Sequence, residues 1–233
     1  MKNKHIVNVD SSLCIRCGLC KKVCPHGLYI ITDKSAEITA QNCNKCGHCV
    51  AVCPKNAVSM SGFDFEPEEL AQDITINPDA LIALIKSGRS MRYFTEKDIP
   101  QETISQIIEA GRYTPTAENK QEVSYVVLKE NKNEYEKTAL KKLRRMKPLI
   151  SLFAPKVRHL EIGDNFFFKG APVVIVVKST DIVDGALAAS AMEIMAQTYG
   201  LGVLYSARKF SFAKSSKNQK YVWVQSCNLT LNE

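Results

Sequence analysis

With 233 residues, 45% of them hydrophobic, the chain is long enough for one ordinary domain and a smaller one. The formal net charge of +7 is mild and no nucleic-acid-binding motif accompanies the basic residues, so we expect no nucleic-acid partner. The longest wholly apolar run, residues 171–177, is far too short to cross a bilayer, and the N-terminus lacks the apolar stretch of an export signal. We therefore expect a cytoplasmic protein without a membrane partner.

Eight of the nine cysteines occur in two copies of one short phrase. Residues 14–25 read CIRCGLCKKVCP and residues 43–54 read CNKCGHCVAVCP. In a reducing compartment such clusters more often bind metal than form disulfides. Each copy has the spacing C-x2-C-x2-C-x3-C-P, which is the bacterial two-cluster pattern in which the last Cys of each run ligates the other cluster. The ninth cysteine, Cys227, is predicted to be an isolated thiol.

This pattern predicts two 4Fe-4S clusters with crossed ligand sets. The first set is Cys14, Cys17, Cys20 and Cys53, and the second set is Cys43, Cys46, Cys49 and Cys24. A structural zinc site is the alternative, but it usually combines two separated C-x2-C pairs into one tetrahedral set. Gly18 and Gly47 allow each loop to curl close to sulfur and turn its amide groups toward it. Short alternating segments around the phrases indicate small hairpins, and residues 1–61 resemble a two-4Fe-4S ferredoxin.

An acidic segment, residues 62–77, follows and is interpreted as a linker. Asn77 before Pro78 predicts the start of a helix that ends at Gly88. Further helices are predicted over about 100–112, 133–146 and 184–199, the last of them buried, and strands over 123–129 and 172–178. Strands mixed with helices indicate an α+β layered domain over residues 78–233.

Two polar loops stand out in this second domain. Arg89, Ser90 and Arg92 follow the first helix and offer two guanidinium groups and a hydroxyl, a set suited to phosphate oxygens. Alternatively, basic residues at a helix C-terminus can simply complement the helix dipole. The second loop, residues 114–121, is a polar turn between a helix and a strand.

Together, and in this order, the two loops resemble the FMN-dependent nitroreductase family. Its Arg-Ser-x-Arg-x-Phe element is matched by residues 89–94 and its Pro-Ser/Thr-x-x-Asn-x-Gln turn by residues 115–121. The resemblance implies that Arg89, Ser90 and Arg92 hold the phosphate and ribityl chain of FMN. It also implies that Asn119 lies by the isoalloxazine ring, with Thr116 and Gln121 binding the cofactor from the same turn. The family further implies a homodimer with FMN bound where the subunits meet.

The whole chain therefore resembles a ferredoxin-nitroreductase fusion. Such a protein is expected to be an oxidoreductase in which the clusters carry single electrons and FMN delivers pairs to nitro, quinone or similar conjugated small molecules. The expected electron donor is a redox partner protein, a ferredoxin or flavodoxin, or NAD(P)H. No side chain is predicted to act as a catalytic acid, base or nucleophile. The alternative is a non-enzymatic electron carrier with a degenerate nitroreductase-like dimerisation domain.

After Ser206 the chain departs from the family pattern. We expect residues 207–233 to lack the family's final strand and basic arm, as a truncation or a shifted reading frame would produce. The expected consequences are weaker flavin retention and a less stable second domain, unless Arg208 and Lys209 compensate. Trp223, in the alternating stretch YVWVQSC, is predicted to be a core or edge-strand residue.

Overall fold

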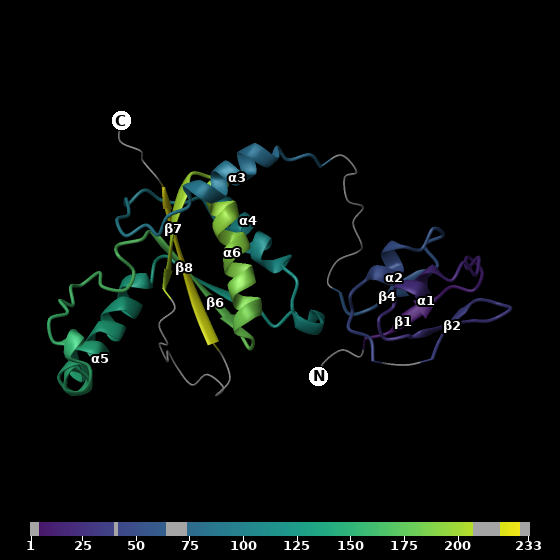
Figure 1. Cartoon of the computed structure of the whole chain (residues 1–233), viewed down its shortest axis with the longest axis horizontal. Helices are drawn as coiled ribbons and strands as arrows, with labels where there is room; N and C mark the ends of the chain where they lie inside the picture. Colours follow the sequence, from purple (N-terminus) through teal and green to yellow (C-terminus); the bar gives the residue numbers. More distant parts are fainter. Residues whose placement is uncertain (1–4, 40–41, 64–73, 207–219, 229–233) are drawn as a thin grey trace. The chain divides into compact units, whose positions relative to one another are not determined.

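The computed structural model describes residues 5–39, 42–63, 74–206 and 220–228, the last range by its backbone only (Figure 1). The chain forms two compact units. The first comprises Met1–Ile74 with Glu118–Lys120, and the second comprises Thr75–Ala117 with Gln121–Glu233. Among the helices of the described residues, none is long and apolar enough to cross a membrane.

The first unit repeats one arrangement twice. Its elements are β1 (Val7–Val9), α1 (Leu19–Val23), β2 (Tyr29–Ile31), β3 (Ala36–Ile38), α2 (His48–Ala51) and β4 (Val58–Met60). The spacing between β1 and β3, between α1 and α2 and between β2 and β4 equals the spacing between Cys14 and Cys43. Strand β1 pairs antiparallel with β4, and β2 pairs antiparallel with β3. Each small sheet therefore joins the two halves of the sequence repeat.

The backbone follows the same repeat at its left-handed positions. Arg16 and Lys45 have φ angles of 60° and 58°, while Gly18 and Gly47, which precede α1 and α2, have φ angles of 74° and 73°. A positive φ is easily adopted by glycine and costs energy for other residues. This explains the shared glycine in the two phrases, because both loops make the same turn just before their helices.

The second unit is built on one four-stranded sheet. Its elements are α3 (Pro78–Ser87), α4 (Gln101–Arg112), β5 (Ser124–Leu128), α5 (Lys132–Phe153), β6 (Val173–Ser179), α6 (Ile182–Thr198), β7 (Leu201–Ser206) and β8 (Lys220–Asn228), with short 3-10 turns at Ala117–Asn119 and Pro155–Val157. The strand order is β5-β6-β8-β7, and every neighbouring pair is antiparallel. This arrangement confirms the predicted α+β class.

Strand β6 separates two apolar cores because successive side chains of a strand point to opposite faces. Val173, Ile175 and Val177 pack with residues of α4 and α6, including Ile107 and Met192. Val174 and Val176 pack with residues of α5, including Leu140, and with Phe167 and Phe168. The sheet is therefore covered on both faces, and α6 lies along it in Figure 1. This accounts for the continuous hydrophobic sequence of β6.

The predicted start of α3 is confirmed. The Asn77 side chain caps the helix by accepting hydrogen bonds from the backbone N–H groups of Asp79, at 2.8 Å, and Ala80, at 3.2 Å. Helix α5 is longer than predicted, since it continues past Pro148 to Phe153 instead of ending near Met146. Proline disfavours a helix interior because it lacks an N–H and crowds the preceding turn, but here the helix persists through it.

Lys220–Asn228 form strand β8, although the sequence after Ser206 lacks the recognisable final strand of the family. Strand β8 lies between β6 and β7, with Val176 opposite Trp223 and Val203 opposite Ser226. Strand pairing uses main-chain groups, so it does not require the family's sequence motif. Trp223 is consequently in an interior strand and not at an edge. Its side chain, that of Cys227, and both Arg208 and Lys209 lie outside what the structure describes.

Candidate functional site

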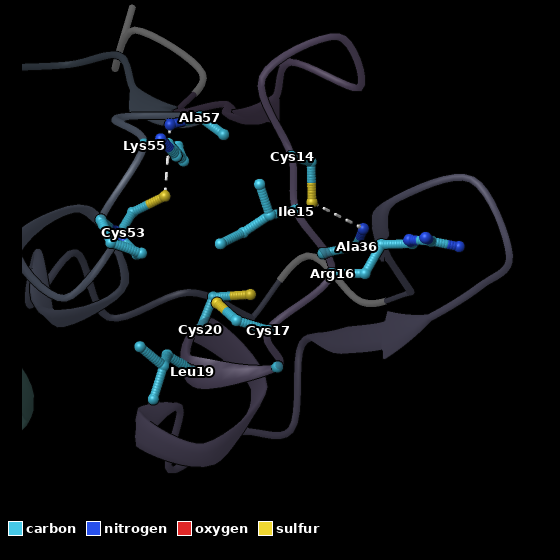
Figure 2. A pocket seen from close by; sticks show the side chains of 12 residues that line it. Cys14, Ile15, Arg16, Cys17, Leu19, Cys20, Ala36, Cys53, Lys55 and Ala57 are labelled. Atoms are coloured by element: carbon cyan, nitrogen blue, oxygen red, sulfur yellow. Dashed lines mark hydrogen bonds between the residues drawn. The ribbon is translucent and has the colours of Figure 1, made fainter.

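One pocket of the first unit collects four thiols from both cysteine phrases. Figure 2 shows Cys14, Cys17 and Cys20 of the first phrase together with Cys53 of the second around this pocket. Cys24, the last cysteine of the first phrase, is not among the described residues that line it. The structure therefore brings together the four side chains that the crossed pattern assigns to one cluster.

Backbone amides point at the sulfur atoms of this pocket. The N–H of Ala36 donates to Cys14 Sγ at 3.4 Å, and that of Ala57 donates to Cys53 Sγ at 3.2 Å (Figure 2). Burial alone would raise the pKa of Cys53. The backbone N–H groups of the residues that follow, Lys55 to Val58, have a larger effect, so the pKa lies below its ordinary value. The thiolate is the form of cysteine that binds metal, and these amides favour that form of Cys53.

The thiol of Cys43 has electrostatic neighbours from both phrases. Burial raises the pKa of Cys43, and the nearby thiols of Cys49, Cys46 and Cys24 raise it further. The N–H of Lys45, which donates to Cys43 Sγ at 3.3 Å, lowers it in part. Cys24 of the first phrase thus lies close enough to influence Cys43 of the second phrase. Among the thiols of the first pocket, burial likewise raises the pKa of Cys20, and the thiols of Cys14 and Cys17 raise it further. The N–H of Lys21 lowers it in part.

The donor set suits a cluster. Among the described residues, no three His, Cys, Asp or Glu side chains converge closely enough to hold a single metal ion. A 4Fe-4S cube takes one thiolate at each iron, so its four ligands stand around a shared space, as the thiols of Figure 2 do. Amide hydrogen bonds to sulfur complete the environment of such a cluster.

Sequence reasoning missed Tyr29, which lies in the core of this unit with Cys20 and Cys49. Burial first, and then the nearby thiols of Cys49, Cys20 and Cys24, raise the pKa of its hydroxyl. One signal was available. In the sequence repeat, Tyr29 occupies the position that the second half fills with Val58, so a hydroxyl stands where the other half has only an apolar side chain.

In the second unit, the predicted phosphate-binding residues lie at the surface beside β7. Ser90 forms an isolated parallel bridge with Val203, and the N–H of Met91 donates to the Val203 carbonyl at 3.0 Å. Arg92 Nη1 donates to the Ser90 carbonyl at 3.2 Å. The side chains of Ser90 and Arg92 are exposed, so they can meet a ligand from solvent.

Arg89 has a structural contact of its own. Its Nη1 donates to the carbonyls of Lys86, at 2.8 Å, and Gly88, at 2.7 Å, at the end of α3. This is the helix-terminal role that the sequence left open as an alternative. The preceding residue, Gly88, lies close to α6, since a Cβ there would meet Gln197 Nε2 at 2.7 Å.

The predicted flavin turn has a tight backbone. Thr116 Oγ1 accepts a hydrogen bond from the N–H of Gln121 at 3.0 Å, and Glu118, Asn119 and Gln121 all have φ angles between 51° and 54°. Left-handed conformations of non-glycine residues are costly and often occur at functional sites. Asn119 Nδ2 donates to the carbonyls of Asn44, at 3.1 Å, and Lys45, at 2.9 Å, within the first unit.

Asp184 of α6 anchors the start of this turn, a role that sequence reasoning also missed. Its side chain is 5% exposed, and Oδ1 accepts a hydrogen bond from the N–H of Ala117 at 3.1 Å. The two sets of predicted flavin residues come from separate segments. Their assignment to one flavin site therefore depends on the family pattern and not on a contact between them.

Two family models match separate stretches of the chain. Residues 6–54 match the 4Fe-4S dicluster domain, and residues 85–208 match the nitroreductase family. A search of curated proteins finds no match. A nitroreductase from Bacteroides fragilis NCTC 9343, solved with bound FMN, is similar at 19% identity and a TM-score of 0.52, over 68% of this chain and 94% of its own.

A second similar structure is a BluB-like flavoprotein from Clostridium difficile 630. Its identity is 16% and its TM-score 0.52, over 66% of this chain and 91% of its own. At such identities the two structures show the fold of the second unit. The family match itself covers more than half of the sequence. The chain belongs to the nitroreductase family, and it carries a 4Fe-4S dicluster domain ahead of its nitroreductase domain.

Proposed function

We propose that the protein is an FMN-dependent oxidoreductase that passes electrons through two 4Fe-4S clusters to nitro, quinone or similar conjugated acceptors. The observation that carries this proposal is the presence of a dicluster domain and a nitroreductase domain on one chain. Bound FMN in the similar Bacteroides fragilis nitroreductase supports the choice of cofactor. We further propose that residues 1–61 form the cluster domain, 62–77 a linker and 78–233 the flavin domain.

The proposed cluster ligands are the two crossed sets. The pocket supports the set Cys14, Cys17, Cys20 and Cys53, and the electrostatic neighbours of Cys43 support the set Cys43, Cys46, Cys49 and Cys24. For the flavin, we propose Arg89, Ser90 and Arg92 at the phosphate and ribityl chain, and Thr116, Asn119 and Gln121 near the ring. The exposed guanidinium group of Arg92 suits a phosphate because its planar donors can bind two oxygens at once.

The two cofactors divide the electron transfer. Each cluster would supply single electrons, and bound FMN would supply the chemistry that converts them to pairs. A nitro group that takes up two electrons and two protons becomes a nitroso group and releases one water, and a quinone becomes a hydroquinone. The protons come from solvent, so no acidic side chain is required. The electrons come from a ferredoxin or flavodoxin, or from NAD(P)H.

We also propose a homodimer. Helix α3 has no buried residue although much of it is apolar, with Leu81, Ile82 and Ile85 exposed by 37%, 45% and 48%. Apolar helix faces of this kind are commonly covered by a symmetric second copy.

The proposed function is tested under anaerobic conditions with protein reduced by dithionite and freed of excess reductant. Mixing it with a nitroaromatic compound should reoxidise the clusters and give the two-electron product in proportion to the electrons stored. Protein stripped of flavin should keep its clusters reduced, and added FMN should restore the reaction. A simple electron carrier would instead lose its electrons equally fast with and without flavin, which would contradict the proposal.

Replacing Asp184 with Ala should weaken FMN binding, because the turn that contains Thr116 loses the acceptor for the Ala117 amide. We expect a stability loss of about 1–3 kcal/mol, typical of leaving a buried donor without its partner. Asp181→Ala is the matched control, since Asp181 caps the same helix through Val183 at 2.7 Å and does not hold the turn. Flavin titration and urea unfolding compare them. Equal FMN affinity in the two variants would show that Asp184 does not organise the flavin turn.

A further inference from the structure

The side chain of Tyr29 is buried without a hydrogen-bond partner. It is 1% exposed, and within the described part of the chain its hydroxyl oxygen meets no acceptor or donor with hydrogen-bond geometry. Leaving a polar group unpaired in an apolar environment is unfavourable, and most buried hydroxyls in folded proteins are paired. The hydroxyl of Tyr29 is therefore a buried donor without the hydrogen bond that such a group normally has.

The surroundings of the hydroxyl are the thiols of the proposed clusters. Cys49 and Cys20 are core neighbours of Tyr29, and Cys24 packs against the same core. In addition to burial, the Cys49 thiol raises the pKa of the Tyr29 hydroxyl through hydrogen bonding and through charge, although the two groups do not have the full geometry of a hydrogen bond. Cys49 and Cys24 both belong to the second proposed ligand set, so the partner is to be sought on the second cluster.

The two halves of the repeat differ at this position. Val58, the counterpart of Tyr29, is also buried, at 5% exposure, and has no polar group. Only one half of an otherwise repeated core thus offers a hydroxyl. A tyrosine hydroxyl carries one hydrogen and can donate it in a hydrogen bond.

We propose that the Tyr29 hydroxyl donates a hydrogen bond to sulfur of the second cluster at Cys49 and makes this cluster easier to reduce than it would be without the hydroxyl. The proposal rests on the ligand sets proposed above. A reduced cluster would carry more negative charge, so a hydrogen bond donated by Tyr29 would stabilise the reduced form more than the oxidised form. No bond is made or broken and no proton is transferred. Tyr29 is then a positioning residue that acts through the cluster.

The test compares the fully loaded wild type with Tyr29→Phe, which removes the hydroxyl and keeps the ring. Midpoint potentials of both clusters are measured by redox titration followed by electron paramagnetic resonance. We expect the equilibrium constant for reducing the second cluster to fall about tenfold, which is about 59 mV for a one-electron couple. The first cluster should change much less. Spectral components are assigned to the two clusters with a Cys24→Ala variant.

Met60→Leu is the matched control. Met60 Sδ lies 4.0 Å from Cys49 Sγ, so the substitution alters a neighbour of the same ligand, but methionine has no hydrogen to donate. Its effect on the potential should be small. A second control, Tyr93→Phe, makes the same chemical change at a side chain that is 91% exposed and should leave both potentials unchanged.

Resonance Raman spectroscopy provides an independent measurement. In D2O, the iron-sulfur stretching bands of the wild type should shift more than those of Tyr29→Phe, because one exchangeable hydrogen near sulfur is missing in the variant.

The proposal is overturned by unchanged potentials with equal deuterium shifts, by a change confined to the first cluster, or by an equal effect of Met60→Leu. Loss of iron from Tyr29→Phe would also overturn it, since it would assign Tyr29 to cluster retention. A wild-type protein without clusters would instead refute the proposed function.

Discussion

Replacing Cys24 with Ala is expected to disrupt the second cluster and leave the first one largely intact. The crossed pattern makes Cys24 the fourth ligand of a cluster whose other ligands come from the second phrase, and the thiol of Cys24 already acts on that of Cys43. Iron content should fall from about eight to roughly four per chain if the cluster is lost outright, the figures following from two 4Fe-4S clusters. Iron and sulfide assays with electron paramagnetic resonance measure the effect.

Two further variants make this experiment decisive. Cys53→Ala should have the reciprocal effect, because Cys53 lines the pocket of the first phrase (Figure 2). Cys227→Ala, which lies outside both phrases, should leave both clusters in place. If Cys24→Ala disrupts the cluster bound by Cys14 instead, the crossed assignment is wrong.

Replacing Arg92 with Ala is expected to weaken FMN binding by about 1.5–3 kcal/mol, the usual scale for a hydrogen bond to a charged group. At about 1.4 kcal/mol per factor of ten, this is a loss of affinity of roughly ten- to more than a hundredfold. Arg89→Ala should weaken binding similarly and also destabilise the second domain slightly, because Arg89 holds the last carbonyls of α3. Flavin fluorescence titration of the apoprotein gives the affinities.

The control for these variants is Arg112→Ala. Arg112 is a surface arginine of the same domain whose ion pair with Glu109, at 2.7 Å, lies within α4. Exposed pairs of this kind contribute little to stability, so flavin affinity should be unchanged. Unaltered affinity in Arg89→Ala, in Arg92→Ala and in the double variant would mean that the phosphate binds elsewhere.

The sequence predicted most where the chemistry depends on local spacing. The spacing of the cysteines determines which side chains one loop can bring around a cluster. The pocket agrees with the prediction that the last cysteine of one phrase joins the first three of the other, since it is lined by Cys14, Cys17, Cys20 and Cys53. The Asn77-Pro78 helix start was also predictable, because capping involves neighbouring residues. The role of the two flavin loops was suggested by their order along the chain and remains a prediction.

Features that depend on distant partners were not predictable in the same way. Strand β8 pairs with β6 and β7, and its own sequence does not reveal where those partners lie. Arg89 contacts carbonyls at the end of α3, but an arginine after a helix can equally bind a phosphate, and the sequence does not distinguish these two roles. Asp184 could be placed on a helix from its sequence, but its bond to Ala117 joins residues far apart in the chain.

The most direct test of the account is the cofactor content of protein purified without oxygen. Two 4Fe-4S clusters and one flavin predict about eight iron, about eight acid-labile sulfide and about one FMN per chain. The ultraviolet-visible spectrum should combine a broad iron-sulfur absorption with resolved flavin bands. Stoichiometric zinc without labile sulfide, together with the absence of flavin, would contradict both the cluster assignment and the proposed oxidoreductase.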